Sequence, residues 1–174
     1  MPVESEKEEK VMNKAMALQV TARGEREIVM TRTFNAPRHL VFEAFTRPDL
    51  IKRWLIGPDG WSMPVCEVDL KVGGRYRYVW RYDKDGKEMG MGGAFNEITP
   101  PERIVVTECF DDAWYDGEAI ITMLFIEQGS STEFTQTMLY QSRAARDGVL
   151  KSPMEKGVAQ SYTRLDQMLA SIAR

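Results

Sequence analysis

The chain has 174 residues, of which 43% are hydrophobic, and it carries a formal net charge of −3 at pH 7. A chain of this length and hydrophobic content is expected to form one domain around a single core. The slight negative charge and the absence of any run of five or more basic residues argue against a nucleic-acid partner.

Metal, disulfide and membrane chemistry are disfavoured by the same composition. The one histidine, His39, and two isolated cysteines, Cys66 and Cys109, form no zinc-binding spacing, so we expect no metal ion and no other cofactor. No stretch reaches the ~20 apolar residues that span a bilayer, so no membrane insertion is expected. With no apolar signal region near the start, we expect a reduced, cytoplasmic protein.

Residues 1–22 differ from the rest of the chain. Glu4–Lys10 is almost entirely charged and cannot bury enough surface to order itself, so we predict a flexible N-terminal tail followed by one domain at 23–174. A short helix over Val11–Leu18 is possible. An arm for dimerisation or regulation, built on Met12, Met16 and Leu18, is the alternative, and both a monomer and a homodimer remain open.

The first predicted elements are a strand and two short helices. Glu27–Phe34 is rich in β-branched residues, as strands are, and Pro37 then suits the first turn of a helix that ends before Pro48. A second short helix follows Asp49, and Gly57 ends it. In the first helix His39 is expected to face solvent.

From residue 63 to residue 140 the hydrophobic period changes from that of a helix to that of a strand. Six strands joined by short turns predict an antiparallel meander, which with the first strand makes a curved seven-stranded sheet: 63–71, 75–83, 88–98, 103–110, 118–127 and 132–140. One apolar stripe then predicts a long C-terminal helix: Met154, Val158, Tyr162, Leu165, Leu169 and Ile172. The predicted class is α+β, with the long helix covering the concave face of the sheet.

This order of elements and several motifs resemble the START-like (Bet v 1-like, SRPBCC) superfamily, and within it the family of the activator of the heat-shock protein 90 ATPase. The matching motifs are Thr31–Pro37, Val41–Pro48, Trp54, Asp69–Arg75, Asp85–Gly86, Pro100–Ile104 and Gly157–Leu165. The resemblance implies a helix-grip fold that encloses a cavity, hydrophobic or lipid-like ligands, and a link to the stress response. Relatives often carry aromatic residues where this chain has Leu55 and Val158, which implies a wider, more aliphatic cavity here.

Basic and aromatic residues alternate over residues 74–82. On a strand, Tyr76, Tyr78 and Trp80 share one face and Arg77 and Arg81 share the other, so the two sets cannot contact one nucleic acid. We expect the aromatic face to point to the long helix. Aromatic rings with polar tips favour a pocket over a plain core, although a plain core remains the alternative.

The predicted pocket combines large apolar side chains with a few polar groups. Its expected ligand-binding residues are Trp54, Tyr76, Tyr78, Trp80, Met91, Trp114, Met123, Phe125, Val158 and Tyr162.

No catalytic residue is assigned, and Glu108 is the only weak candidate. Either Ile104, Val106 and Glu108 face inward, or the alternate set with Thr107 and Cys109 does; the rarity of unpaired buried carboxylates favours the second. No cationic neighbour in the sequence activates Cys109, so an inert thiol is expected.

The sequence therefore predicts a protein that binds a small, largely apolar molecule, with catalysis the less favoured reading. Two other functions remain open. One is a polyketide cyclase-like or hydrolase-like enzyme that uses Glu108 or a cavity tyrosine. The other is a chaperone-ATPase activator whose acidic tail and exposed apolar surface contact a protein partner.

Overall fold

A computed structural model describes residues 2–173 of the chain, with eight strands and five helices in that range. The helices are α1 (Pro2–Ala15), α2 (Arg38–Thr46), α3 (Pro48–Trp54), α4 (Arg143–Lys151) and α5 (Met154–Ile172). The strands are β1 (Gln19–Arg23), β2 (Glu27–Phe34), β3 (Trp61–Val68), β4 (Arg75–Tyr82), β5 (Glu88–Thr99), β6 (Arg103–Phe110), β7 (Ala119–Gln128) and β8 (Ser131–Leu139).

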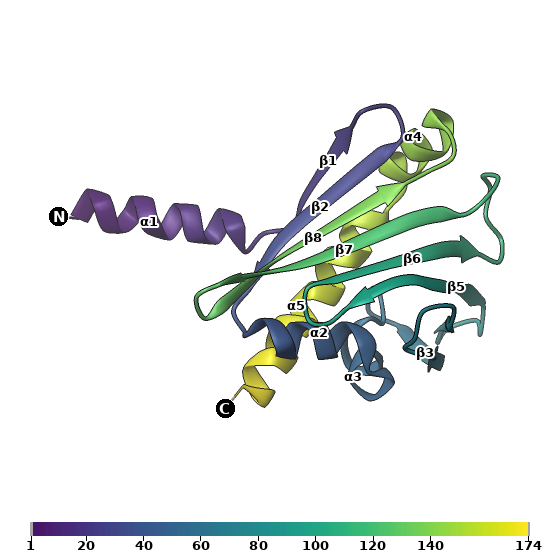
Figure 1. Cartoon of the computed structure of the whole chain (residues 1–174), viewed down its shortest axis with the longest axis horizontal. Helices are drawn as coiled ribbons and strands as arrows, with labels where there is room; N and C mark the ends of the chain where they lie inside the picture. Colours follow the sequence, from purple (N-terminus) through teal and green to yellow (C-terminus); the bar gives the residue numbers. More distant parts are fainter. Residues whose placement is uncertain (1, 174) are drawn as a thin grey trace.

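The strands form one antiparallel sheet, and the helices other than α1 lie along one face of it or at its ends. The strand order is β1-β2-β8-β7-β6-β5-β4-β3, so β3 to β8 make a continuous meander and β2 pairs with the last strand. Helix α5 runs behind the sheet across several strands, with α2 and α3 at one end and α4 at the other (Figure 1). This is the helix-grip fold, and it confirms the predicted α+β class and the long C-terminal helix.

The sequence predicted seven strands, and the sheet has eight. Gln19–Arg23 pairs with β2 along its whole length, so these residues, which the sequence placed mostly in the tail, belong to the sheet. The segment is largely exposed and lacks an alternating apolar pattern. It is a strand because β2 offers an unpaired edge, which no pattern within the segment itself reveals.

Two helices differ from the sequence-based assignment. Helix α1 covers the charged segment expected to be unstructured, and it projects away from the body (Figure 1). Helix α4 was not predicted because its nine residues carry few apolar side chains. Its N-cap was the available signal, since the Ser142 side chain accepts a hydrogen bond from the backbone N–H of Ala145. Flexibility of residues 1–22 stays a prediction.

An aromatic cluster joins the helices to the strands at the end of the sheet where α2 and α3 lie. Phe45 stacks on Phe134 with ring centroids 4.5 Å apart, and Trp54 lies 4.8 Å from Phe45. Trp54 also donates a hydrogen bond from Nε1 to the carbonyl of Ala44. These buried rings account for a large part of the apolar surface that stabilises the fold.

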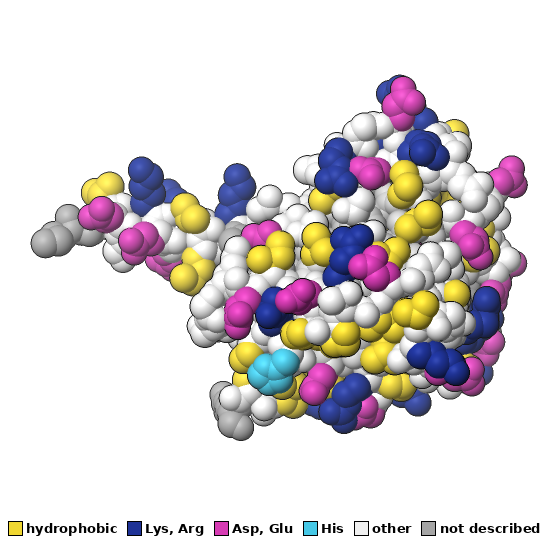
Figure 2. Space-filling model, viewed as in Figure 1, with side chains coloured by type: hydrophobic (Ala, Val, Ile, Leu, Met, Phe, Trp, Pro, Cys, Tyr) yellow, Lys and Arg dark blue, Asp and Glu magenta, His cyan; other side chains and the backbone are white. Residues whose placement is uncertain are grey.

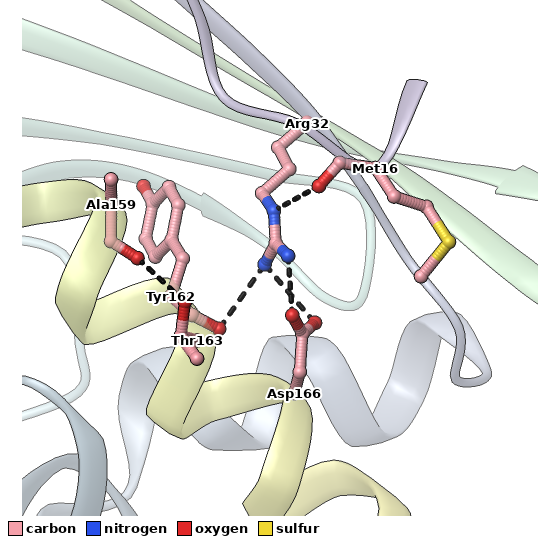
Figure 3. A network of polar contacts seen from close by, with 6 residues as sticks. All are labelled: Met16, Arg32, Ala159, Tyr162, Thr163 and Asp166. Carbon is pink, nitrogen blue, oxygen red and sulfur yellow. Dashed lines mark hydrogen bonds and ion pairs between the residues drawn. The ribbon is translucent and has the colours of Figure 1, made fainter. Parts of the chain in front are cut away.

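An ion pair between buried Arg32 and partly exposed Asp166 attaches α5 to β2 (Figure 3). Arg32 is 7% exposed and donates both terminal nitrogens to the carboxylate of Asp166. The same guanidinium donates to the Tyr162 carbonyl at 3.1 Å and to the Met16 carbonyl at 2.8 Å. Arg32 therefore holds together the sheet, the long helix and the segment between α1 and β1.

The sheet face turned away from α5 carries apolar and charged side chains side by side, and apolar side chains on α1 are uncovered (Figure 2). Ile120 and Ile126 are about two-fifths exposed on this outer face, and His39 is exposed on α2 as predicted. Among residues 2–173, no helix is long and apolar enough to cross a membrane.

Candidate functional site

Strand β4 separates its aromatic and basic side chains as the alternation predicts. Tyr76, Tyr78 and Trp80 are buried in the core between the sheet and α5. On the outer face, Arg77 forms a bidentate pair with Asp111, and Arg81 pairs with Glu88. The two sets lie on opposite sides of the sheet, so the stretch does not form a single basic and aromatic surface.

The inner face next to β4 is centred on Glu108 in β6. Ile104 and Val106, which share the face of Glu108, are 1% and 5% exposed and belong to the core, whereas Cys109 is exposed. The alternative favoured by the sequence, with Cys109 on the inward face, is therefore wrong. The argument failed because it assumed that a carboxylate without a partner avoids the interior.

The nearest neighbours of Glu108 on the inner face are small. Glu108 lies opposite Ala119 in β7, and one step along from the Gly92–Cys109 pair it lies beside Gly93 in β5. A Cβ atom at Gly93 would lie 1.9 Å from the Thr107 carbonyl oxygen, so no side chain fits at this position. The two strands beside β6 therefore place no long side chain next to the Glu108 carboxyl group at this level.

The next strand on each side carries a tyrosine at the same level as Glu108, so these positions form a row across the sheet. Tyr76 lies opposite Gly93, and its hydroxyl donates to the Thr107 carbonyl at 2.6 Å. Tyr140 follows β8 directly and comes next to Ala119, one step beyond the Leu139–Ile120 pair. The row therefore reads tyrosine, alanine, glutamate, glycine, tyrosine.

Two further tyrosines complete a ring of aromatic side chains around Glu108. Tyr78 lies beside Tyr76 with centroids 5.2 Å apart, and Tyr115, from the loop between β6 and β7, packs edge-on against Tyr140 at 5.6 Å. Burial and then the Glu108 carboxylate raise the pKa of Tyr115 to about 12. The same two causes, in the same order, raise the pKa of Tyr76 and Tyr140 further.

The Glu108 carboxylate also contributes to the raised pKa of Tyr78. Burial first, then the Cys66 thiol and then Glu108, raise its pKa. Burial also raises the pKa of the Cys66 thiol to about 11, so this cysteine is protonated near neutral pH and is a poor nucleophile.

Glu108 itself has an unusual proton affinity. Burial raises the pKa of its carboxyl from 4.5 to about 7, although the side chain remains only half-buried. None of the ion pairs formed by the described residues includes Glu108, and the two buried arginines, Arg32 and Arg146, bind other partners. A carboxyl that titrates near pH 7 can accept or donate a proton at that pH.

Two tyrosine hydroxyls on the inner face lack a hydrogen-bond partner in the described part of the chain. Across residues 2–173, the hydroxyls of Tyr78 and Tyr162 make no hydrogen bond to protein. The one enclosed side-chain polar atom without a partner in this range is Oε1 of Gln160. Neither tyrosine hydroxyl is among the fully enclosed atoms of this range that lack a partner, so each keeps some contact with solvent.

Nine of the ten predicted ligand-binding residues fall into two groups, and Trp114 lies apart from both. Trp54, Phe125 and Tyr162 belong to the aromatic cluster beside α2 and α3. The second group lies near Glu108 or in the half-buried wall toward α5 and consists of Tyr76, Tyr78, Trp80, Met91, Met123 and Val158. Trp114 is 61% exposed and lies on the loop after β6.

Trp114 covers one end of α4 instead of lining the interior. A Cβ atom at Gly148 would lie 2.0 Å from its ring, so the indole rests directly on the backbone of α4. Its ring also packs edge-on against Tyr115 at 5.1 Å. The loop after β6 therefore connects the Glu108 row to the molecular surface.

Sequence reasoning missed Tyr115 and Tyr140 as members of this site. Tyr115 lies in a loop with no periodic pattern, and Tyr140 lies one residue beyond its strand. Each reaches Glu108 only through the folding of the sheet, so neither position carries a local signal. The alternation in β4, which places Tyr76 and Tyr78 on the inner face, was the only sequence pattern that indicated this site.

Two open depressions on the surface lie elsewhere. One, of about 540 Å³, is on the outer face of the sheet, and Arg77 and Asp111 on its wall are already paired with each other. The other, of about 460 Å³, lies beside the end of α5 near Arg53. Within residues 2–173, no group of three or more potential ligands is arranged to hold a metal ion.

Comparisons with solved structures agree with the architecture. A crystal structure of a protein from Rhodobacter sphaeroides is 29% identical, with a TM-score of 0.84 over 89% of this chain and 99% of that one. Protein NE0264 from Nitrosomonas europaea is 24% identical, with a TM-score of 0.74 over 86% of this chain and 97% of that one. An HSP90 activator from Plasmodium falciparum is 24% identical, with a TM-score of 0.62 over 83% of this chain and 96% of that one.

A search of curated proteins finds no match. The family comparison does: residues 35–170 match the model described as Activator of Hsp90 ATPase homolog 1-like protein. That range contains α2 to β8, α4 and most of α5, and hence the whole row around Glu108. The chain therefore belongs to the Activator of Hsp90 ATPase homolog 1-like family, within the START-like superfamily.

Proposed function

We propose that the protein binds a small, largely apolar molecule in the space between the sheet and α5. The observation that supports this proposal is a pair of tyrosines in the core, Tyr78 and Tyr162, whose hydroxyls have no hydrogen-bond partner among the described residues and are not fully enclosed. Ligand pockets combine such an apolar wall with a few polar groups that fix orientation. Here Glu108 and the surrounding hydroxyls are those polar groups.

The expected ligand lies along the inner face of β4 and β5 toward α5. Tyr78, Trp80 and Met91 form the apolar floor, and Val158 on α5 is half-buried above the core. Trp80 donates from Nε1 to the Leu55 carbonyl at 2.7 Å, which fixes its ring against the segment after α3. A fixed aromatic ring requires little reorganisation when a ligand binds.

Val158→Trp tests this proposal because it adds volume on the inner face of α5, one turn from Tyr162. An environment-sensitive naphthalene dye should bind the natural protein, and Val158→Trp should weaken that binding at least about tenfold, equivalent to ~1.4 kcal/mol. The variant should unfold cooperatively and lose less than the ~1 to 3 kcal/mol that overpacking of a filled core costs.

Lys156→Trp is the matched control, because Lys156 is exposed on the opposite side of α5. It should leave dye affinity unchanged. Equal loss of affinity in the two variants, or no dye binding by the natural protein, would contradict the proposal. Native mass spectrometry of the freshly purified protein would then identify a co-purified molecule.

Activation of an Hsp90-type ATPase is the second candidate function, and the family match supports it. A protein partner would have an accessible apolar surface in Val3, Val11 and Met12, which are between 63% and 74% exposed on α1. The purified chain should then raise the steady-state ATPase rate of an Hsp90 from the same organism, and removal of residues 2–15 should reduce the effect. An unchanged ATPase rate at saturating protein would rule this candidate out.

A further inference from the structure

The row around Glu108 contains a negative charge with no matching positive charge. Every strand that borders it contributes a small or aromatic residue at this level: Gly93 from β5, Ala119 from β7 and Tyr76 from β4. Besides burial, Glu108 raises the pKa of four tyrosines around it, and the other titratable groups that act on these tyrosines are acids or thiols, none of them cationic: Tyr76, Tyr78, Tyr115 and Tyr140, with Cys66, Cys109, Glu118 and the tyrosines themselves. An ionised carboxylate in such a setting is costly unless something compensates it.

The tyrosine rings around Glu108 favour an organic cation as the group that balances its negative charge. Tyr76 and Tyr78 lie on one side of Glu108, and Tyr115 and Tyr140 form an edge-on pair on the other. The negative faces of aromatic rings attract organic cations, and several rings around one site recognise ammonium groups. A carboxylate in their midst adds direct charge complementarity.

We propose that the ligand of this site carries an ammonium group, which binds between Glu108 and the tyrosine rings, while its apolar part lies along Tyr78, Trp80 and Met91. The proposal rests on the proposed function and names the chemical class of the ligand, an amphiphilic amine. The residues beside Glu108 on the neighbouring strands, Ala119 and Gly93, carry no long side chain that would cover its carboxyl group. Trp114 and Tyr115 lie where the loop after β6 joins this row to the surface.

Competition among matched eight-carbon compounds tests the proposal. At about pH 8, octylamine is cationic and Glu108 is ionised. Octylamine should displace the naphthalene dye at a concentration about tenfold lower than 1-octanol does, and octanoate should be the weakest competitor. Between about pH 6 and pH 8, the affinity for octylamine should rise about tenfold as Glu108 loses its proton, whereas the affinity for octanol should not rise.

Glu108→Gln keeps the size of the side chain and removes its charge. It should abolish the preference for octylamine and its pH dependence, while octanol still displaces the dye. Glu6→Gln, at an exposed carboxylate on α1 away from the sheet, should keep both. Equal displacement of the dye by octylamine and octanol in the natural protein would overturn the amine assignment and leave apolar binding intact. A preference for octylamine that survives Glu108→Gln would do the same. Failure of every compound and of the dye to bind would overturn the proposed function as well.

Discussion

Asp166→Ala should lower the free energy of unfolding by about 2 to 3 kcal/mol, less than the ~3 to 5 kcal/mol for one partner of a fully buried ion pair, because the Asp166 side chain is 32% exposed. The loss is large because Arg32 stays 7% exposed and would retain its charge without the bidentate carboxylate. The carbonyls of Met16 and Tyr162 still accept from Arg32, which places the expected value toward the lower end. Urea denaturation monitored by tryptophan fluorescence measures it.

Two matched variants separate the cost of an unpaired charge from the loss of packing. Adding Arg32→Met to Asp166→Ala should restore part of the stability, since no buried charge is then left uncompensated. Arg81→Gln, which breaks an ion pair whose side chains are both 48% exposed, should cost under about 1 kcal/mol. A double variant no more stable than Asp166→Ala would show that the network acts through packing alone.

Glu108→Gln should raise the free energy of unfolding by up to about 3 kcal/mol at about pH 8, and by little below about pH 4.5. The sign follows from burial, which raises the pKa of Glu108 from 4.5 to about 7. The folded protein then binds this proton more tightly than the unfolded chain does. The natural protein therefore loses stability as the pH rises from about 4.5 to about 7, and the glutamine variant lacks that loss.

Denaturant unfolding of both proteins at several pH values measures this difference. Glu118→Gln should change stability by less than about 0.5 kcal/mol at each pH, because Glu118 is exposed and outside the ion pairs of the described residues. A Glu108→Gln protein with the same pH profile as the natural one would show that Glu108 is well solvated, contrary to its placement here. A stabilising substitution at this position would also indicate that the carboxylate is retained for function.

The sequence by itself determined the elements with strong periodicity. Residues 27–34 and 103–110 were predicted as strands with the same bounds as β2 and β6, and the stripe from Met154 to Ile172 predicted α5. Each of these elements has a solvent side and a core side, so burial imposes a period on the residues. The alternation in β4 likewise predicted which side chains face the core.

The tertiary structure decided what local patterns do not encode. Residues 19–23 form a strand only because β2 has a free edge, and the phase of β6 turned Glu108 inward against the usual avoidance of buried carboxylates. Tyr115 and Tyr140 come from a loop and a strand end, and they meet Glu108 only across the folded sheet. Contacts between residues distant in sequence depend on strand register, and a single strand does not determine its register by itself.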